Sequence, residues 1–106
     1  MKNVILESPY AGQRKANVEY AKECMRDSLK RGEAPLASHL LYTQEGILDD
    51  LVPEEREIGI SAGLSWLAKA ELHVFYVDLG ISPGMQAALK ATKALGLDYE
   101  TRSIRG

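Results

Sequence analysis

The sequence predicts an α/β domain of the flavodoxin or Rossmann-like type, with three layers and a parallel four-stranded sheet between helices. Short apolar runs alternate with helical patterns along the chain, in the order β-α-β-α-β-α-β. Turn residues separate each strand candidate from the next helix. A chain of 106 residues suits one domain over 1–106.

Strands are expected over 3–6, 34–37, 72–77 and 99–104. The first and third are the most apolar, which indicates strands buried on both faces in the middle of the sheet. Pro35 favours an edge for the second strand, because proline donates no ladder hydrogen bond. We therefore expect the strand order 2-1-3-4. With that order, ligands bind beyond the carboxyl ends of the first and third strands, where the direction of winding changes.

Helices are expected in the three intervals between the strands. The first carries apolar residues at helical spacing over 18–29. The second, over 53–70, is apolar nearly all round, which predicts burial against the sheet and against a partner subunit. Gly59 and Gly63 in this helix permit close approach of another helix. The third helix follows Ser82 and ends before Gly96.

Composition and charge exclude several classes of protein. A net charge of −2 and a pI of about 5.7 argue against a nucleic acid polymer as partner. No apolar run approaches the ~20 residues that span a bilayer, and Met1 leads directly into a strand, so neither a membrane segment nor a signal peptide is expected. The single cysteine, Cys24, is expected to be buried and fits the reducing cytoplasm. His39 and His73 show no metal-ligand spacing, so we expect no metal and no cofactor.

Two turns should meet at the predicted ligand-binding edge. The first is Glu7-Ser8-Pro9-Tyr10-Ala11-Gly12, and the second runs from Asp78 to Met85. In the second turn, Ser82 can cap the helix while Gly84 leaves the backbone open, so this helix start favours an anion such as phosphate. The Asp78 carboxylate is suited to accept hydrogen bonds from ribose hydroxyls.

Other candidate residues each have a structural alternative. Tyr10 either stacks on a base or covers the end of the sheet. Arg14 and Asn17 share a helix face, which either holds phosphate or ribose or is simply solvated. His39 is a ligand contact or a loop-packing residue. The long connection over 38–52, with Tyr42 and Gln44, is a candidate wall or lid of the site, whereas Trp66 suits the core or a subunit interface.

Taken together, several short motifs resemble the nucleoside 2-deoxyribosyltransferase-like superfamily, in particular a small branch found in phages and prophages. The motifs are Ser8-Pro9-Tyr10, Arg14 with Asn17, Arg31-Gly32-Glu33-Ala34-Pro35-Leu36, His39-Leu40-Leu41-Tyr42 and Gly80-Ile81-Ser82-Pro83-Gly84-Met85. The resemblance implies a flavodoxin-like fold, homo-oligomers and a nucleoside or nucleotide pocket. The implied contacts are Ser8, Pro9, Tyr10, Gly12, Arg14, Asn17, His39, Asp78, Ser82, Gly84 and Met85.

The sequence departs from this family at its nucleophile. Enzymes of the superfamily cleave or exchange the N-glycosidic bond through a glutamate one helical turn beyond the Ser-x-Gly motif, and that position here is Ala88. An alanine cannot attack an anomeric carbon and then leave it. Glu7, Asp78, Asp49 or Asp50 could replace the missing carboxylate.

Three functions therefore remain open. We favour a binding protein that captures or senses a nucleotide-type small molecule, such as a phage sponge for a nucleotide signal of host immunity. The alternative is a divergent N-glycosidase or deoxyribosyltransferase that uses Glu7 or Asp78. The third is a partner-binding α/β module with a vestigial pocket.

Overall fold

The computed structural model describes residues 1–106 and has a single sheet of four parallel strands. The strands are β1 (Lys2–Glu7), β2 (Glu33–Leu36), β3 (Leu72–Tyr76) and β4 (Tyr99–Arg102). The helices are α1 (Arg14–Lys30), α2 (Ser38–Leu41), α3 (Pro53–Leu67) and α4 (Pro83–Ala94). The strand order is β2-β1-β3-β4, so the predicted fold class and the predicted order are both confirmed.

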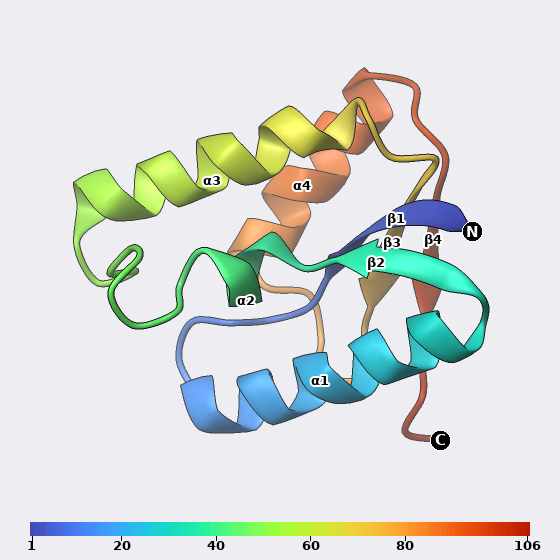
Figure 1. Cartoon of the computed structure of the whole chain (residues 1–106), viewed down its shortest axis with the longest axis horizontal. Coiled ribbons are helices and arrows are strands. Elements are labelled where there is room, and N and C mark those ends of the chain that lie inside the picture. The colour runs from blue at the N-terminus through green and yellow to red at the C-terminus, as the bar shows by residue number, and fades with distance from the viewer.

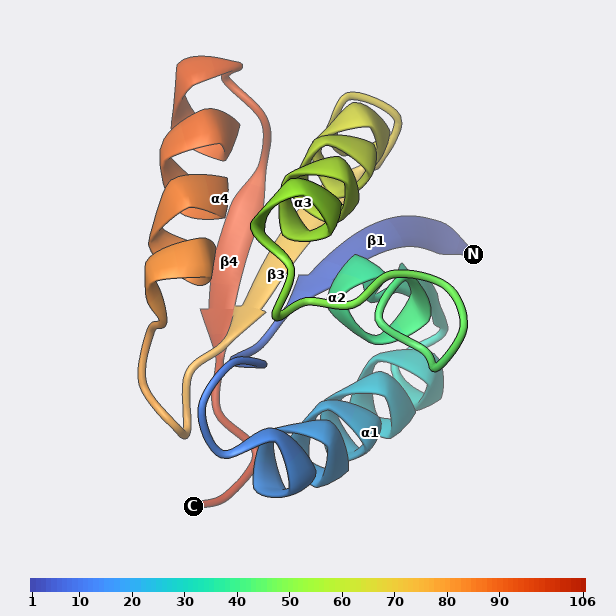
Figure 2. The ribbon, with the colours of Figure 1, turned by 90° about the vertical axis from the view of Figure 1, so that its left-hand side faces the viewer.

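The helices form two layers around the sheet (Figures 1 and 2). Helix α1 covers one face, and α3 and α4 lie over the other. The larger core lies under α1, where Tyr20 and Cys24 pack against Val4, Leu6, Val74 and Tyr76. A smaller core joins Phe75 to Met85 and Ala88 of α4. Cys24 is buried and free, as expected from its place among apolar neighbours.

Local signals in the sequence explain where the elements end. Strand β2 lies at an edge of the sheet, as Pro35 predicts. Helix α1 stops at Gly32, which has a φ of 84° and ends the helix in the left-handed conformation that glycine adopts without strain. The segment 38–52, expected as a continuous loop, opens with the short helix α2.

Helix α3 departs from its predicted burial on two sides. Only Leu67 of this helix is buried, whereas Ile58 is 56% and Trp66 47% exposed. The helix lies against α2 and stands off the sheet, which leaves a hollow beneath it. Trp66 is not a core residue, and its Nε1–H donates to the Tyr42 hydroxyl at 2.8 Å.

The two predicted glycines permit the close approach of α3 to its neighbours. A Cβ atom at Gly63 would lie 2.7 Å from Oγ of Ser38 in α2, and one at Gly59 would lie 3.3 Å from Cδ1 of Leu48. A contact below 3.0 Å requires a shift of the Ser38 side chain or of the helix. The predicted close approach of another helix is therefore confirmed at Gly63, whereas Gly59 faces Leu48 in the segment 38–52.

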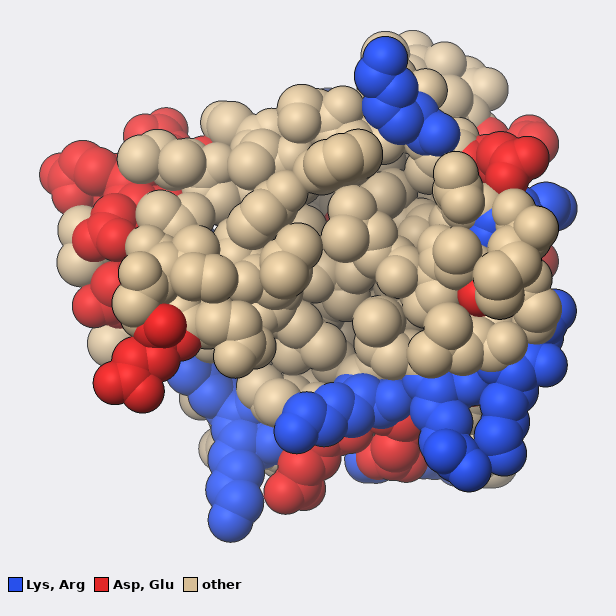
Figure 3. All heavy atoms as spheres, viewed as in Figure 1, with Lys and Arg blue, Asp and Glu red and all other residues tan.

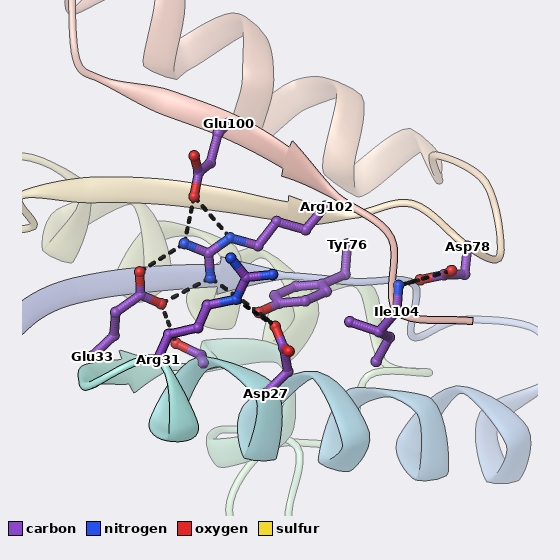
Figure 4. Close-up of polar contacts among 9 residues, drawn as sticks. Asp27, Arg31, Glu33, Tyr76, Asp78, Glu100, Arg102 and Ile104 are labelled. Atoms are coloured by element: carbon purple, nitrogen blue, oxygen red, sulfur yellow. Dashed lines mark hydrogen bonds and ion pairs between the residues drawn. The ribbon is translucent and has the colours of Figure 1, made fainter. Parts of the chain in front are cut away.

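A buried ion pair joins the two edge strands across the α1 face of the sheet (Figure 4). The Arg102 guanidinium in β4 reaches Glu33 in β2 through two hydrogen bonds, of 2.6 and 2.8 Å, and also contacts Glu100. Nη1 of Arg102 also donates to the Tyr76 hydroxyl, which in turn donates to Asp27. Hydrogen bonds from Arg102 lower the pKa of Glu33, and the Glu33 carboxylate raises the pKa of Arg102.

Candidate functional site

A cavity of about 190 Å³ lies beyond the carboxyl end of β1, between α2, α3 and the start of α4. Its position agrees with the rule for ligands in open α/β sheets. The loop after β1, the first turn of α2, the inner face of α3 and the first turn of α4 form its walls. The cavity exists because α3 stands off the sheet.

The structure brings most of the predicted site residues to this cavity, and they come from three segments of the chain. Those on the wall are Glu7, Ser8, Tyr10, His39, Ser82, Gly84 and Met85, together with Ala88 at the position of the family nucleophile. Tyr42 and Asp50 of the segment 38–52 also line it, whereas Gln44 does not. Pro9, Gly12, Arg14, Asn17 and Asp78 lie outside it.

Ser8 and His39 form a polar pair on the wall. The Ser8 hydroxyl lies 2.8 Å from Nε2 of His39, while Nδ1 of His39 is buried without a hydrogen-bond partner. Burial lowers the pKa of His39, since a charged imidazole loses hydration there. The Tyr10 ring stands edge-on to the imidazole, with centroids 6.5 Å apart. A neutral histidine of this kind can exchange hydrogen bonds with a ligand but offers no positive charge.

Glu7 provides a carboxyl group on the same wall. It is the last residue of β1, and its side chain is 18% exposed. Its Oε1 atom lies 3.4 Å from Nε2 of His73, a neighbour on β3 that is only 1% exposed. Nδ1 of His73 lies in turn 2.5 Å from the hydroxyl oxygen of Thr92 in α4. The carboxyl group is thus supported from behind by two buried polar side chains.

The start of α4 offers fewer free N–H groups than its sequence suggests. Ser82 caps the helix as predicted, since its Oγ accepts from the Met85 N–H at 3.2 Å. The Gln86 N–H donates to the Ser82 carbonyl, and Pro83 has no N–H. Gly84 therefore keeps the one unpaired N–H of this first turn. A single N–H provides less for a phosphate than the open helix start that we expected.

Arg14 and Asn17 support the loop after β1 rather than the cavity. The Asn17 amide donates to the backbone carbonyls of Tyr10 and Ala11 and fixes the path of this loop. Arg14 lies over the Tyr10 ring, 5.3 Å from its centroid, and 3.8 Å from Asp50. It lines a second, shallower hollow beside the cavity. These residues orient Tyr10, and so act on the cavity indirectly.

Asp78 is used by the fold, in place of the predicted contact with a ribose. Its carboxylate accepts hydrogen bonds from the Tyr20 hydroxyl at 2.5 Å and from the backbone N–H groups of Ile104 and Arg105. Figure 4 shows the contact with Ile104. The Tyr20 hydrogen bond lowers the pKa of Asp78. The C-terminal segment thus occupies the oxygens that were expected to bind a ligand, so Glu7 is the stronger candidate for a carboxylate in the cavity.

Several wall residues were missed in the sequence. Helix α3 contributes Glu55, Arg56, Gly59 and Gly63, although no site residue was predicted in it. The glycine pair could have signalled this, because glycines four apart on an apolar helix mark close approach. The support of Glu7 by His73 was also missed, although a histidine inside a buried strand calls for a polar partner.

The structure defines the class of fold: an α/β domain of the flavodoxin type, with a cavity at the carboxyl edge of its sheet. The chain belongs to the family described as Domain of unknown function (DUF7768), whose model matches residues 2–102. The fold is also that of a 2-deoxyribosyltransferase from the psychrotolerant bacterium Bacillus psychrosaccharolyticus. The two align with a TM-score of 0.66 and 19% identity over 95% of this chain and 72% of that one.

No curated protein matches the chain. No helix of the protein combines the length and the apolar character that a bilayer span requires.

Proposed function

We propose that the protein binds a nucleoside or nucleotide-type small molecule in the cavity and does not use the covalent chemistry of the superfamily it resembles. The observation that carries this proposal is the wall itself: Tyr10, Ser8, His39 and Glu7 are gathered there, while the family's nucleophile position is Ala88. Helix α4 has no acidic residue that could take its place. The shared fold with a 2-deoxyribosyltransferase supports a nucleoside as the ligand.

The wall suits the two parts of a nucleoside. The Tyr10 ring offers an aromatic face on which a base can stack. The Ser8–His39 pair and the Glu7 carboxyl group offer acceptors and donors for sugar hydroxyls or base edges. Arg56 is the single cation on the wall, so it is the side chain that can contact the phosphate of a nucleotide.

Capture without turnover is the role that such a site supports. A protein that binds its ligand and returns it unchanged can sequester or sense it. In a phage, such a protein would remove a nucleotide signal that host immunity makes. The resemblance to the phage branch suggests this form of the proposal. The buried, unpaired Cys24 is compatible with a reducing cytoplasm.

Calorimetric titration with 2′-deoxyadenosine, 2′-deoxycytidine and their 5′-monophosphates tests the proposal. We expect binding of at least one nucleoside, with the compound recovered intact after denaturation of the protein. Tyr10→Ala should weaken binding by about 1–3 kcal/mol, the usual worth of one base stacked on an aromatic ring. Tyr99→Ala is the matched control, because Tyr99 is exposed on β4 and lies outside the cavity. Absence of binding by all four compounds contradicts the proposal.

N-glycosidic cleavage is a second candidate function, and the place of Glu7 favours it. Glu7 is on the cavity wall, and its second oxygen, Oε2, has no hydrogen-bond partner in the protein. A carboxylate can attack an anomeric carbon or activate a water there. Chromatography of a deoxynucleoside after incubation should then show free base, and Glu7→Gln should abolish its release. Release that persists in Glu7→Gln would remove Glu7 from the reaction.

We also propose that the protein forms homo-oligomers through the outer face of α3. Ile58 and Trp66, which do not line the cavity, are 56% and 47% exposed on that helix. Apolar side chains gathered on one helix face mark an association surface. A second copy of the chain is the occupant that the resemblance implies.

A further inference from the structure

Three polar side chains form a continuous path from the cavity into the interior, along the α4 side of the sheet. Glu7 Oε1 lies 3.4 Å from His73 Nε2, His73 Nδ1 lies 2.5 Å from Thr92 Oγ1, and Thr92 Oγ1 lies 2.7 Å from the Ala88 carbonyl oxygen. His73 and Thr92 are 1% and 0% exposed. Water therefore does not replace the contacts of Thr92 with His73 and Ala88, and the hydrogens on this part of the path can be counted.

The count begins at the inner end. A carbonyl oxygen accepts and cannot donate, so the single hydrogen of the Thr92 hydroxyl points to the Ala88 carbonyl. The Thr92 oxygen is then an acceptor towards His73, and Nδ1 of His73 must carry a hydrogen. In the neutral imidazole with a hydrogen on Nδ1, the other nitrogen, Nε2, has only a lone pair.

That lone pair faces the Glu7 carboxyl group. A bare Nε2 opposite an ionised carboxylate would place two acceptors face to face, in a region that is shielded from water on the His73 side. One hydrogen between Nε2 and Oε1 turns the contact into a hydrogen bond, whether it resides on the imidazole or on the carboxyl group.

We propose that Glu7 and His73 share one proton between Oε1 and Nε2, and that His73, fixed by Thr92, is a positioning residue for the Glu7 carboxyl group. The pair has no net charge in either form, because an ionised carboxylate accompanies a cationic imidazole or both groups are neutral. The proton also directs Oε1 away from the cavity and leaves Oε2 as the oxygen that can reach a ligand.

The remaining groups around the pair are consistent with this assignment. His39 of α2 faces Glu7 and is neutral, since burial lowers its pKa. Helix α4 contributes no charged group to the cavity wall, and the Phe75 ring lies against His73 at 4.4 Å between centroids. The other ionisable residues on the wall come from the β1 loop, the segment 38–52 and α3: Tyr10, Tyr42, Asp50, Glu55 and Arg56.

The role of Oε2 rests on the proposed function. With its partner oxygen held by His73, Oε2 accepts a hydrogen bond from a donor of the ligand, such as a sugar hydroxyl or an exocyclic amine. The side-chain amide of a Glu7→Gln variant can place a donor at either position, so it loses both the shared proton and a fixed acceptor.

Nuclear magnetic resonance of the full chain tests the shared proton without any ligand. Long-range proton–nitrogen correlation of the imidazoles should show Nδ1 of His73 protonated at every pH at which the protein is folded. The Nε2 signal of His73 and the carboxyl carbon of Glu7 should change together when the shared proton is removed. A neutral His73 with its hydrogen on Nε2, or a change in one of these two signals without the other, would overturn the proposal.

Variants separate positioning from mere packing. Thr92→Ser keeps the hydroxyl acceptor and should keep the tautomer of His73, whereas Thr92→Val removes it and should admit the form with hydrogen on Nε2. Glu7→Gln should abolish the joint change of these two signals. If Thr92→Val leaves the His73 tautomer as it is in the unmodified protein, Thr92 does not fix the imidazole.

A binding measurement with 2′-deoxyadenosine as the probe then tests the contact between Glu7 and the ligand. Thr92→Val should weaken binding by about tenfold and Thr92→Ser should restore it, the equivalent of one lost hydrogen bond. If the probe does not bind at all, the proposed function fails. The resonance data then decide on their own whether the proton is shared. If the probe binds equally to Thr92→Val and to Thr92→Ser, the positioning role fails although the function holds.

Discussion

At the scale of single residues, His39 shows how burial sets the properties of the cavity. The imidazole has one partner, the Ser8 hydroxyl, and its buried Nδ1 has none. Protonation would add a charge to a place where neither nitrogen is well hydrated. This residue therefore resists protonation, and its pKa lies below the ordinary value of 6.5.

The stability of the protein should therefore depend on pH through His39. Because the folded-state pKa is lowered, its contribution is complete above about pH 6.5 and is lost as the pH falls towards the folded-state pKa. We expect the free energy of unfolding, measured with urea at a series of pH values, to fall across this interval. His39→Gln, which cannot titrate, should flatten that part of the profile. An unchanged slope in the variant would show that another group is responsible.

Arg102 provides a second prediction for a single residue. Arg102→Met leaves the Glu33 carboxylate buried without its cation, which costs about 3–5 kcal/mol of stability. Glu33→Gln should cost a similar amount, and the double variant less than the sum of the two. Chemical denaturation of all three proteins measures this coupling. Arg105→Met is the control, because the Arg105–Glu23 pair is exposed. Costs that simply add would contradict a coupled pair.

At the scale of elements, the place of α3 decides whether the cavity exists. Gly63 lets the helix lie close to α2, because a Cβ atom at this position would lie 2.7 Å from Oγ of Ser38. Its own side chains bury little, so this contact is a large part of what holds α3 in position. The cavity and the exposed apolar face are two consequences of the same arrangement.

Gly63→Leu should therefore displace α3 and weaken ligand binding. The added side chain meets Ser38 Oγ and Cβ, which lie 2.7 and 3.3 Å from the position of its Cβ. We expect destabilisation of about 1–3 kcal/mol, typical of overpacking, and a loss of affinity for the nucleoside probe. Ser61→Leu, at an exposed position of the same helix, is the matched control. Thermal melts and calorimetry measure both effects, and equal behaviour of the two variants would contradict this role of Gly63.

At the scale of the whole molecule, the surface is divided by chemistry (Figure 3). The centre of the face shown is free of charged side chains, with acidic residues at the end where α3 begins and basic residues along α1. A surface of this kind is suited to contact with a second copy of the chain.

We therefore expect light scattering to report a mass above that of the 11.7 kDa chain. Ile58→Lys should shift the protein to a monomer by placing a charge on the association surface. Leu95→Lys, at an exposed residue beyond α4, should leave the mass unchanged. A monomer before substitution would exclude this surface as a self-association site at the concentration used.

More of the fold than of the candidate site could be predicted from the sequence. The apolar runs, Pro35 and the Ser82 cap gave the strand order and the edges of the elements, because each acts through local backbone chemistry. The burial of α3 was predicted incorrectly, since an apolar helix pattern does not say whether a sheet or another chain covers it. The partners of Asp78 were not predicted for a similar reason. Its partners, Tyr20 and Ile104, are distant in the sequence and meet it only after folding.

The ion pair between Arg102 and Glu33 also has a consequence for the order of events in folding. Its partners are separated by 69 positions and lie on opposite edges of the sheet, so they can meet only after all four strands have assembled. A contact formed so late is absent from the transition state, and its removal accelerates unfolding while the refolding rate stays the same. Stopped-flow kinetics of Arg102→Met should show a change in the unfolding limb alone. The ion pair then lengthens the lifetime of the native state, because it slows unfolding.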